Sequence, residues 1–347
     1  MKILIDTSPL DMGHAVRGIG TYTRLLAQFL EKQANITVVR SGTKEADDFK
    51  PDLIHYPYFD LFFSTLPIMR SQPTVVTIHD VIPLKFSKYY PPGIRGRARY
   101  IKQRSALKTV EAVITDSESS KEDIHQHLKI SKDNIHVVYL AANPELTKTD
   151  DKEIRRVKRK YKLPQNYVLY VGDINYNKNI PQLIKAIKFL PDNVKLVCVG
   201  QSFQEQDIPE WHWIETQLAL SNVENKVKFI PGVPGGAVKD LAAIFSGAQC
   251  YVQPSLYEGF GLPVLEAMQC LVPVVTTQNS SLEEVAGEHA LYVSTDAESI
   301  ATGLNQVLSW NKADRKKRTL AALEWSKNFN WQKTTQDTIS VYEKILK

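Results

Sequence analysis

Short runs of Val, Ile and Leu recur along this chain at the length of a buried β-strand, and they alternate with segments of helical periodicity. A first series of such runs lies at residues 2–6, 36–39, 53–56, 74–78, 112–115 and 135–139, with helical patterns at 20–31, 93–109 and 119–128. Continuous apolar strands that alternate with helices indicate a parallel sheet covered on both faces, because each parallel connection needs a crossover. The first part of the chain is therefore predicted to be a Rossmann-like α/β domain.

The same pattern restarts after a charged, Lys/Arg-rich segment at 147–162, which is typical of a solvated helix face, with anion binding as the alternative. The second series of strand-like runs lies at 167–171, 194–199, 227–230, 249–253, 273–276 and 290–293. A second Rossmann-like domain follows from it, and we place the boundary at 160/161. The last stretch, 312–347, has a helical pattern throughout.

Composition and charge exclude several classes of protein. The net charge of +5, from 43 basic and 38 acidic residues, is too small to indicate nucleic-acid binding without a localised patch. Cys198, Cys250 and Cys270 lie in apolar runs without zinc-ligand spacing, so we expect buried thiols in a reducing compartment. The chain starts directly with a strand pattern and has no apolar run of about 18 residues, which predicts a cytoplasmic protein.

Two glutamates, Glu258 and Glu266, flank a glycine-rich turn in the sequence EGFGLPVLE. The turn follows a predicted strand, and Pro263 marks the first turn of a predicted helix. Backbone N–H groups at a helix start favour an anion such as a phosphate, and here they belong to Gly259, Phe260, Gly261 and Leu262. Because helical side chains lean towards the N-terminus, Glu266 is expected to reach back into the space beside Glu258.

A carboxylate next to a phosphate repels it, so both glutamates more plausibly accept hydrogen bonds from hydroxyl groups on either side of the phosphates. A nucleotide sugar carries such hydroxyls on its ribose and on its sugar. The alternative is that Glu258 is a solvated loop residue and Glu266 an ordinary first-turn acid.

The segment EGFGLPVLEA resembles the E-x7-E signature of retaining glycosyltransferases of family 4, which have the two-domain GT-B fold. The resemblance covers essentially the whole chain. It implies an α/β GT-B fold of two Rossmann-like domains that face each other across a cleft. Residues 1–160 would form the acceptor-side domain, 161–325 the nucleotide-sugar donor domain, and 326–347 a C-terminal helix that returns to the N-terminal domain.

Four glycine and valine positions are donor-binding candidates through this resemblance. Gly18 and Gly20 belong to a GIG loop that faces the donor in the family. A dinucleotide fingerprint would have its glycines nearer the strand end and a third glycine at position 23, which is Thr23, so a nicotinamide cofactor is disfavoured. A glycine pair needed only for its turn is the alternative. Gly232 and Val233 are expected to contact the base through their backbone.

His79 and Asp80 follow a predicted strand, so they lie at the carboxyl end of a parallel sheet, where such folds bind ligands. The sequence IHDVIPLKF resembles the family's HD segment, whose His lies near the reacting sugar. His79 and Glu258 are therefore the catalytic candidates. Asp80 either orients His79 or caps the loop.

Lys178 is the expected diphosphate-binding cation, because it stands at the start of another predicted helix after a strand and a glycine. A surface lysine is the alternative. Family members usually carry an Arg with this Lys, just after the glycine or just before the lysine. Here those places hold Asp173 and Asn177, so one cation stands where two are expected.

We interpret the chain as a retaining glycosyltransferase that transfers a hexose of mannose or glucose type from a nucleoside-diphosphate sugar, such as GDP-mannose or UDP-glucose. The acceptor would be a sugar, a polysaccharide or a lipid-linked carbohydrate. No metal or other cofactor is expected, because the sequence has no D-x-D carboxylate cluster. The alternatives are a nucleotide-sugar epimerase of the same fold and a non-catalytic module that binds nucleotide sugars.

A predicted basic helix at 93–109 contains Arg95, Arg99 and Lys102. In the resembled family this domain handles the acceptor, which is often lipid-linked. Two interpretations stay open: a peripheral contact with the inner face of the membrane through these residues, and a solvated helix face with only a thin apolar stripe.

Overall fold

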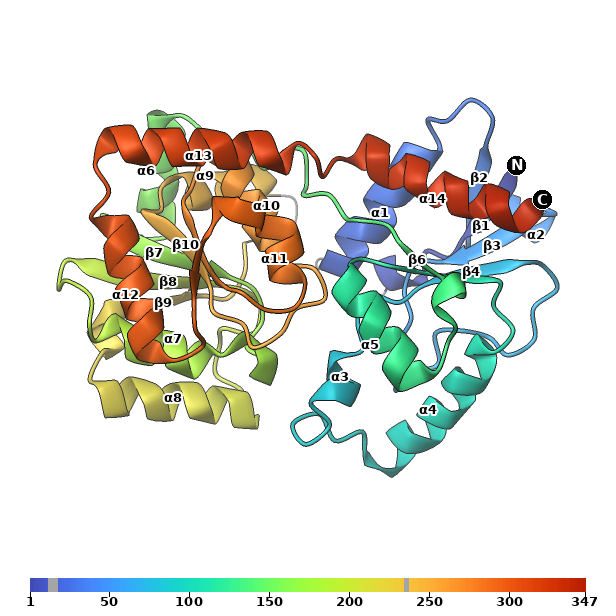
Figure 1. The fold of residues 1–347 in the computed structure, drawn as a ribbon, viewed down its shortest axis with the longest axis horizontal. Coiled ribbons are helices and arrows are strands. Elements are labelled where there is room, and N and C mark those ends of the chain that lie inside the picture. Colours follow the sequence, from blue (N-terminus) through green and yellow to red (C-terminus); the bar gives the residue numbers. More distant parts are fainter. Residues whose placement is uncertain (12–17, 234–236) are drawn as a thin grey trace. The chain divides into compact units, whose positions relative to one another are not determined.

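The computed structural model describes residues 1–11, 18–233 and 237–347, and these form two compact units (Figure 1). Unit 1 consists of Met1–Ala141 together with Phe329–Lys347, and unit 2 of Ala142–Asn328. Each unit is built on one parallel sheet with six strands among the described residues. None of the helices in these ranges has the length and apolar character needed to cross a membrane.

The sheet of unit 1 has the strand order β2-β1-β3-β4-β5-β6. Its strands are β1 (Lys2–Ile5), β2 (Thr37–Arg40), β3 (Leu53–Tyr56), β4 (Thr74–Thr77), β5 (Ala112–Thr115) and β6 (Ile135–Val137). The α-helices of this unit are α1 (Gly18–Leu30), α2 (Lys44–Asp47), α3 (Ile82–Lys85), α4 (Gly93–Leu107), α5 (Glu118–Leu128) and α14 (Trp331–Leu346). Apolar residues of β4, β5 and α5 form much of its core, as their continuous Val and Ile content predicts.

The sheet of unit 2 has the order β12-β11-β10-β7-β8-β9. Its strands are β7 (Asn166–Val171), β8 (Val194–Val199), β9 (Val227–Ile230), β10 (Cys250–Gln253), β11 (Val274–Thr277) and β12 (Leu291–Val293). The α-helices of this unit are α6 (Asp151–Lys160), α7 (Ile180–Ile187), α8 (Pro209–Ser221), α9 (Val238–Ser246), α10 (Leu262–Gln269), α11 (Ser281–Ala286), α12 (Ala297–Leu308) and α13 (Lys312–Ser326).

The strand order of unit 2 reverses between β7 and β10. The chain runs outward from β7 to β8 and β9, and then returns to place β10 on the other side of β7. Open α/β sheets bind ligands at such a switch point, beyond the carboxyl ends of the strands. The segments that follow β7 and β10 are therefore the first place to look for a site.

The boundary between the units lies earlier than the sequence analysis placed it, because α6 belongs to unit 2. Asp240 on α9 is buried and accepts hydrogen bonds from Lys160 Nζ at 2.6 Å, from Tyr161 Oη at 2.8 Å and from the guanidinium of Arg156. Two of the basic side chains that the sequence suggested were solvated, Arg156 and Lys160, thus tie α6 to α9, which a local charge pattern does not reveal.

The final stretch contains two helices, α13 and α14, and the second begins at Trp331 where the sequence analysis placed the C-terminal helix at 326–347. α13 ends at Ser326, and α14 starts after Asn330, whose side chain caps it by accepting from the backbone N–H of Lys333 at 2.9 Å. α14 lies in unit 1, where Tyr342 hydrogen-bonds His55 of β3 at 2.6 Å. Burial lowers the pKa of His55 to about 3, so its ring is neutral in this contact.

Candidate functional site

The segment with the two glutamates forms a buried strand, a loop and a helix, as the sequence predicts. All four residues of β10 are buried, and α10 begins at Leu262 with Pro263 in its first turn. Gly261 caps this helix with a φ of +104°, and a Cβ there would lie 2.8 Å from a methyl group of Leu282. Only glycine satisfies both the backbone angle and the space, which fixes the turn before the helix.

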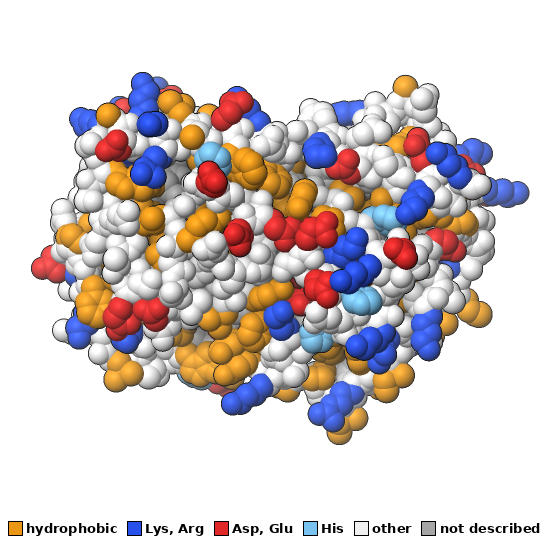
Figure 2. Space-filling view, viewed as in Figure 1, with side chains coloured by type: hydrophobic (Ala, Val, Ile, Leu, Met, Phe, Trp, Pro, Cys, Tyr) orange, Lys and Arg blue, Asp and Glu red, His pale blue; other side chains and the backbone are white. Residues whose placement is uncertain are grey.

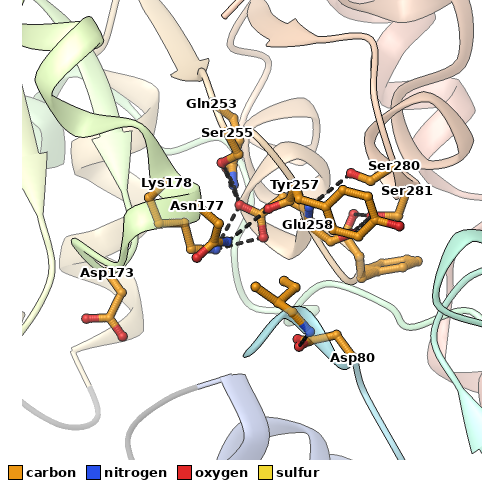
Figure 3. Close-up of polar contacts among 12 residues, drawn as sticks. Asp80, Asp173, Asn177, Lys178, Gln253, Ser255, Tyr257, Glu258, Ser280 and Ser281 are labelled. Carbon is orange, nitrogen blue, oxygen red and sulfur yellow. Dashed lines mark hydrogen bonds and ion pairs between the residues drawn. The ribbon is translucent and has the colours of Figure 1, made fainter. Parts of the chain in front are cut away.

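Glu258 lies in the loop, with its carboxylate buried among three donors (Figure 3). Lys178 Nζ is 2.7 Å from each carboxylate oxygen. Gln253 Nε2 and Ser255 Oγ each donate to Oε1 at 2.6 Å. The expected cation and the expected catalytic carboxylate therefore form an ion pair, 80 positions apart in the sequence.

The strand order explains this pairing. Lys178 follows β7 and Glu258 follows β10, and these two strands are neighbours at the switch point of the sheet. Gln253 and Ser255 were not identified from the sequence. Their signal is present, because alternate residues of a strand point to one side, and Tyr251, Gln253 and Ser255 alternate towards the loop.

The loop that carries Glu258 is held from two sides (Figure 3). Ser280 Oγ accepts from the backbone N–H of Glu258 at 2.9 Å, and Ser281 Oγ donates to the carbonyls of Glu258 and Phe260 at 3.0 and 2.9 Å. On the other side, Asn177 Nδ2 donates to the carbonyl of Tyr257 at 2.9 Å. These clamps keep the carboxylate in place before any ligand arrives.

The two positions where a second cation was expected have other partners. Asn177 is buried and serves the loop clamp. The carboxylate of Asp173 accepts a hydrogen bond from Ser202, and its backbone carbonyl accepts from Tyr170 Oη at 2.7 Å. Both residues therefore help to shape the segment around Lys178, and neither adds positive charge.

Glu266 is half-buried on α10, and its side chain makes none of the hydrogen bonds found among the described residues. Burial raises its pKa to about 7. The charges of Glu258 and Glu266 both raise the pKa of Tyr251, after the larger effect of burial. That Glu266 reaches the same ligand as Glu258 stays a prediction.

The remaining donor-binding candidates of unit 2 lie in two places, after strand β10 and after strand β9. Gly259 and Phe260 are buried, and Leu262 is half-buried at the first position of α10. Gly232 follows β9 with a φ of +87°, and Val233 beside it is half-buried. β9 is two strands away from β7, so these two residues lie on the far side of β8 from Lys178.

His79 in unit 1 is also paired with a buried carboxylate. It follows β4, and its Nδ1 lies 2.8 Å from Oδ2 of Asp116, which follows the neighbouring strand β5. Tyr22 contacts the ring edge-on with centroids 5.0 Å apart. Burial opposes the charged form of His79, but the Asp116 carboxylate outweighs it and raises the pKa of the imidazole.

The structure shows which of its two possible roles Asp80 has. Asp80 accepts from the backbone N–H of Ile82 at 2.9 Å and so caps the next turn, while Asp116 orients His79.

Gly18 and Gly20 lie in the first turn of α1 rather than in a loop before it, with Gly18 exposed and Gly20 buried. Arg17, which precedes them, lies outside the described residues.

Comparison with known proteins places both units in one family. Residues 151–322 match the family described as Glycosyl transferases group 1, and residues 14–146 match that described as Glycosyltransferase Family 4. O-antigen chain mannosyltransferase B of Escherichia coli is 31% identical over 307 residues, which are 85% of this chain and 75% of that protein. The chain belongs to glycosyltransferase family 4. The family predicted from EGFGLPVLEA is thereby confirmed, and this family 4 chain is a glycosyltransferase.

Some other curated relatives of the family 4 chain are longer, and the chain spans about a third of their length. Among solved structures, sucrose-phosphate synthase from Thermosynechococcus elongatus matches with a TM-score of 0.76 and 19% identity, over 99% of each chain. Anabaena HepE in complex with UDP-glucose matches with a TM-score of 0.72 and 19% identity, again over 99% of each chain. These likenesses confirm the predicted GT-B fold.

Proposed function

We propose that this glycosyltransferase transfers a hexose from a nucleoside-diphosphate sugar to a sugar, polysaccharide or lipid-linked acceptor, with retention at the anomeric carbon. The observation that carries the proposal is the Lys178–Glu258 pair at the switch point of unit 2. The E. coli relative is a mannosyltransferase of an O-antigen chain, which favours mannose. The structural likeness to HepE bound to UDP-glucose supports a nucleotide-sugar donor. None of the proteins named above is an epimerase.

Each candidate residue has a defined task in this proposal. Lys178 and the N-terminus of α10 neutralise the diphosphate as it leaves. Glu258 stabilises the positive charge that builds up on the sugar, and Glu266 accepts hydrogen bonds from the ribose hydroxyls. His79, oriented by Asp116, is the catalytic candidate of unit 1.

The proposal includes catalysis without a metal. The residues that the structure describes contain no group of three or more His, Cys, Asp or Glu side chains arranged to hold one. The diphosphate charge would instead meet Lys178 and the dipole of α10. This assignment makes Lys178 more important than it would be beside a second cation.

The proposal is tested with purified protein and a panel of UDP- and GDP-hexoses, measuring nucleoside diphosphate release with and without carbohydrate acceptors. We expect release that requires an acceptor, persists in excess chelator and gives an α-linked product from an α-linked donor by NMR. Loss of turnover in chelator that magnesium or manganese restores would contradict the metal-free mechanism. Release without any acceptor, or inversion at the anomeric carbon, would contradict the assigned reaction.

We also propose that the protein works in the cytoplasm and contacts the anionic inner face of a membrane through α4, where a lipid-linked acceptor would lie. Ile94 and Ile101 are seven residues apart, so they share one side of this helix, and they are 89% and 70% exposed. Arg95, Arg99 and Lys102 are exposed beside them, while Gln103 on the opposite side is buried. Such a face, apolar along its middle and basic at its edge, suits a bilayer surface.

A neighbouring loop extends this surface. Phe63 is 59% exposed and lies under the guanidinium of Arg99, with 5.4 Å from ring centroid to Cζ, and Met69 is 91% exposed. Figure 2 shows basic and hydrophobic side chains together on the part of unit 1 that carries α4. Sedimentation with vesicles of neutral or anionic lipid tests the contact. Ile94→Ser with Ile101→Ser should abolish binding to anionic vesicles and leave donor binding intact, and unchanged sedimentation would contradict the proposal.

A further inference from the structure

Three side chains of unit 2 point in succession towards the carboxylate of Glu258. Tyr251 and Gln253 lie on β10, and Ser255 follows two residues later, so strand alternation places all three on one side. Tyr251 Oη donates to Gln253 Oε1, and Gln253 Nε2 in turn donates to Glu258. All four side chains are buried. Such a buried chain of polar groups is favourable only when each member is satisfied.

The two oxygens of Glu258 have unequal surroundings (Figure 3). Oε1 accepts from Lys178 Nζ at 2.7 Å and from Gln253 and Ser255 at 2.6 Å each. Among the described residues, Oε2 accepts only from Lys178, also at 2.7 Å. Oε1 is thus held by two neutral donors as well as by Lys178, whereas Oε2 is held among the described residues only by Lys178, the cation assigned to the diphosphate.

Glu258 and Tyr251 hold opposite ends of the Gln253 amide. A carboxylate only accepts hydrogen bonds, so the amide NH₂ group faces Glu258 and the amide oxygen faces Tyr251. Burial, and then the charge of Glu258, raises the pKa of Tyr251, so its hydroxyl keeps the proton that it donates to the amide oxygen. Tyr251 therefore holds the amide in the orientation that Glu258 requires.

We infer that Gln253 and Ser255 are positioning residues, which hold Oε1 of Glu258 so that Oε2 faces the transferred sugar once the donor diphosphate engages Lys178. This inference rests on the proposed function, in which Glu258 stabilises the sugar and Lys178 the diphosphate. An ammonium group has three N–H donors, and a diphosphate competes for them with the carboxylate.

The neutral donors matter because a buried carboxylate that loses its cation needs other partners to stay charged and in place. Gln253 and Ser255 carry no charge, so a phosphate does not draw them away from Oε1. They are also fixed by the sheet itself. The carbonyl of Gln253 accepts from Thr276 at 3.0 Å, and that of Ser255 accepts from Thr277 at 2.7 Å, both on β11.

The inference is tested with Gln253→Met and Ser255→Ala, which remove the donors and keep most of the volume. We expect each to lower kcat about tenfold or more, the size of a hydrogen bond to a charged group, with nearly unchanged nucleoside diphosphate affinity by calorimetry. Gln249→Met is the matched control. Gln249 precedes the same strand, bonds Asn166 at 3.3 Å and does not contact Glu258, so its kcat should stay at the wild-type value.

A double-mutant cycle separates positioning from a general structural role. In a Glu258→Gln background, Gln253→Met and Ser255→Ala should cause no further loss of kcat, because their effect acts through the Glu258 carboxylate. The same loss in both backgrounds would overturn the inference. If Glu258→Gln alone lowers kcat while the two variants do not, the positioning role is wrong and the proposed function stands. If Glu258→Gln has no effect, the proposed function itself fails.

Tyr251→Phe covers the case in which a more drastic variant does not fold, because it removes one hydroxyl and keeps the ring. The oxygen of the Gln253 amide then loses this partner and the amide is held less firmly, so we expect a loss of kcat smaller than that of Gln253→Met. A wild-type kcat in this variant, with the fold intact by thermal unfolding, would overturn the role given to Tyr251 in the inference.

Discussion

Each unit places one cationic and one anionic side chain beyond neighbouring parallel strands, but the two pairs are built differently. In unit 2, Lys178 and Glu258 meet across the switch point between β7 and β10. In unit 1, His79 and Asp116 meet across β4 and β5, away from the reversal of strand order between β1 and β3. The first pair is surrounded by clamps and neutral donors. In the second, Nε2 of the imidazole is buried and has no hydrogen-bond partner among the described residues.

The two pairs differ in the group that the other residues hold in place, which is a carboxylate in unit 2 and an imidazole in unit 1. Three donors fix the Glu258 carboxylate. In unit 1 a single carboxylate, that of Asp116, orients His79 and raises its pKa against the effect of burial. The unit 2 pair is suited to constant electrostatic stabilisation, and the unit 1 pair to a role that depends on pH. The following predictions test that contrast, from the largest effect to the smallest.

Glu258→Gln should have the largest effect. It removes the charge at the centre of the unit 2 pair and keeps its shape, so kcat should fall about 10²- to 10³-fold, the range for losing one preorganised electrostatic contact. The donor KM should change little, because the interaction strengthens only in the transition state. Steady-state kinetics measure both constants, with the exposed Glu283→Gln as control. A raised KM with normal kcat would reverse the assignment.

Lys178→Ala should weaken binding of the nucleoside diphosphate by about 2 to 3 kcal/mol, the range for a charge-assisted hydrogen bond to phosphate. Asp173 and Asn177, at the positions where a second cation was expected, bring no positive charge to replace it. Isothermal titration calorimetry measures the dissociation constant. Lys185→Ala is the control, because Lys185 is a half-buried lysine of α7 that pairs with Glu298 and not with Glu258. Equal affinities of wild type and Lys178→Ala would show that the diphosphate binds elsewhere.

Glu266→Gln should separate the two glutamates. It should raise the donor KM with little change in kcat, because contacts with ribose hydroxyls are equally strong in the ground and transition states. If Glu258→Gln also raises the donor KM with little change in kcat, the two glutamates do not have the separate roles proposed here.

Glu266→Gln should also change stability. The folded state holds the proton of Glu266 up to a pKa of about 7, so ionisation destabilises the protein as pH rises from the ordinary value of 4.5 towards 7. The variant lacks this penalty and should be more stable above pH 7, by at most about 3 kcal/mol. Urea unfolding at pH 5 and pH 8 measures the difference. If the stability difference between variant and wild type is the same at pH 8 as at pH 5, Glu266 ionises normally.

Asp116→Asn should have the smallest effect, and this effect should be greatest in mild acid, where that of Glu266→Gln on stability is smallest. Since the pKa of His79 is raised in the folded state, the pair stabilises the protein fully below the ordinary pKa of histidine. That stability is lost as pH rises through the folded-state pKa. The stability gap between wild type and variant should therefore be about 1 kcal/mol in mild acid and shrink in alkali. Unfolding curves at pH 6 and pH 9 that keep the same gap would show that His79 does not titrate there.

Much of the fold was predictable because its signals are local. The run at 194–199 is β8 with the same bounds, and the helix predicted at 20–31 is α1, Gly18–Leu30. The glycine of the turn before α10 was also predictable. Gly261 adopts a positive φ that other residues rarely take, so its identity records the backbone conformation directly.

The domain boundary was harder to predict, because the charge pattern of α6 is compatible with solvent. Asp240 binds Lys160 and Tyr161 from 80 and 79 positions away, and this contact assigns the helix to unit 2. The C-terminal helix predicted from residue 326 begins at Trp331 for a related reason. Helical periodicity continues through the cap at Asn330, and the packing of α14 in unit 1 fixes where the second helix begins.

The sequence by itself determined the strands and helices, the glycine turn, the family and the identities of Glu258, Lys178 and His79 as candidates. Only the tertiary structure decided their partners. Lys178 and Glu258 are 80 positions apart, and His79 and Asp116 are 37 apart. Each pair meets because two parallel strands are neighbours in the sheet. Strand order depends on how whole helices and strands pack together, and the local periodicity of side chains does not encode it.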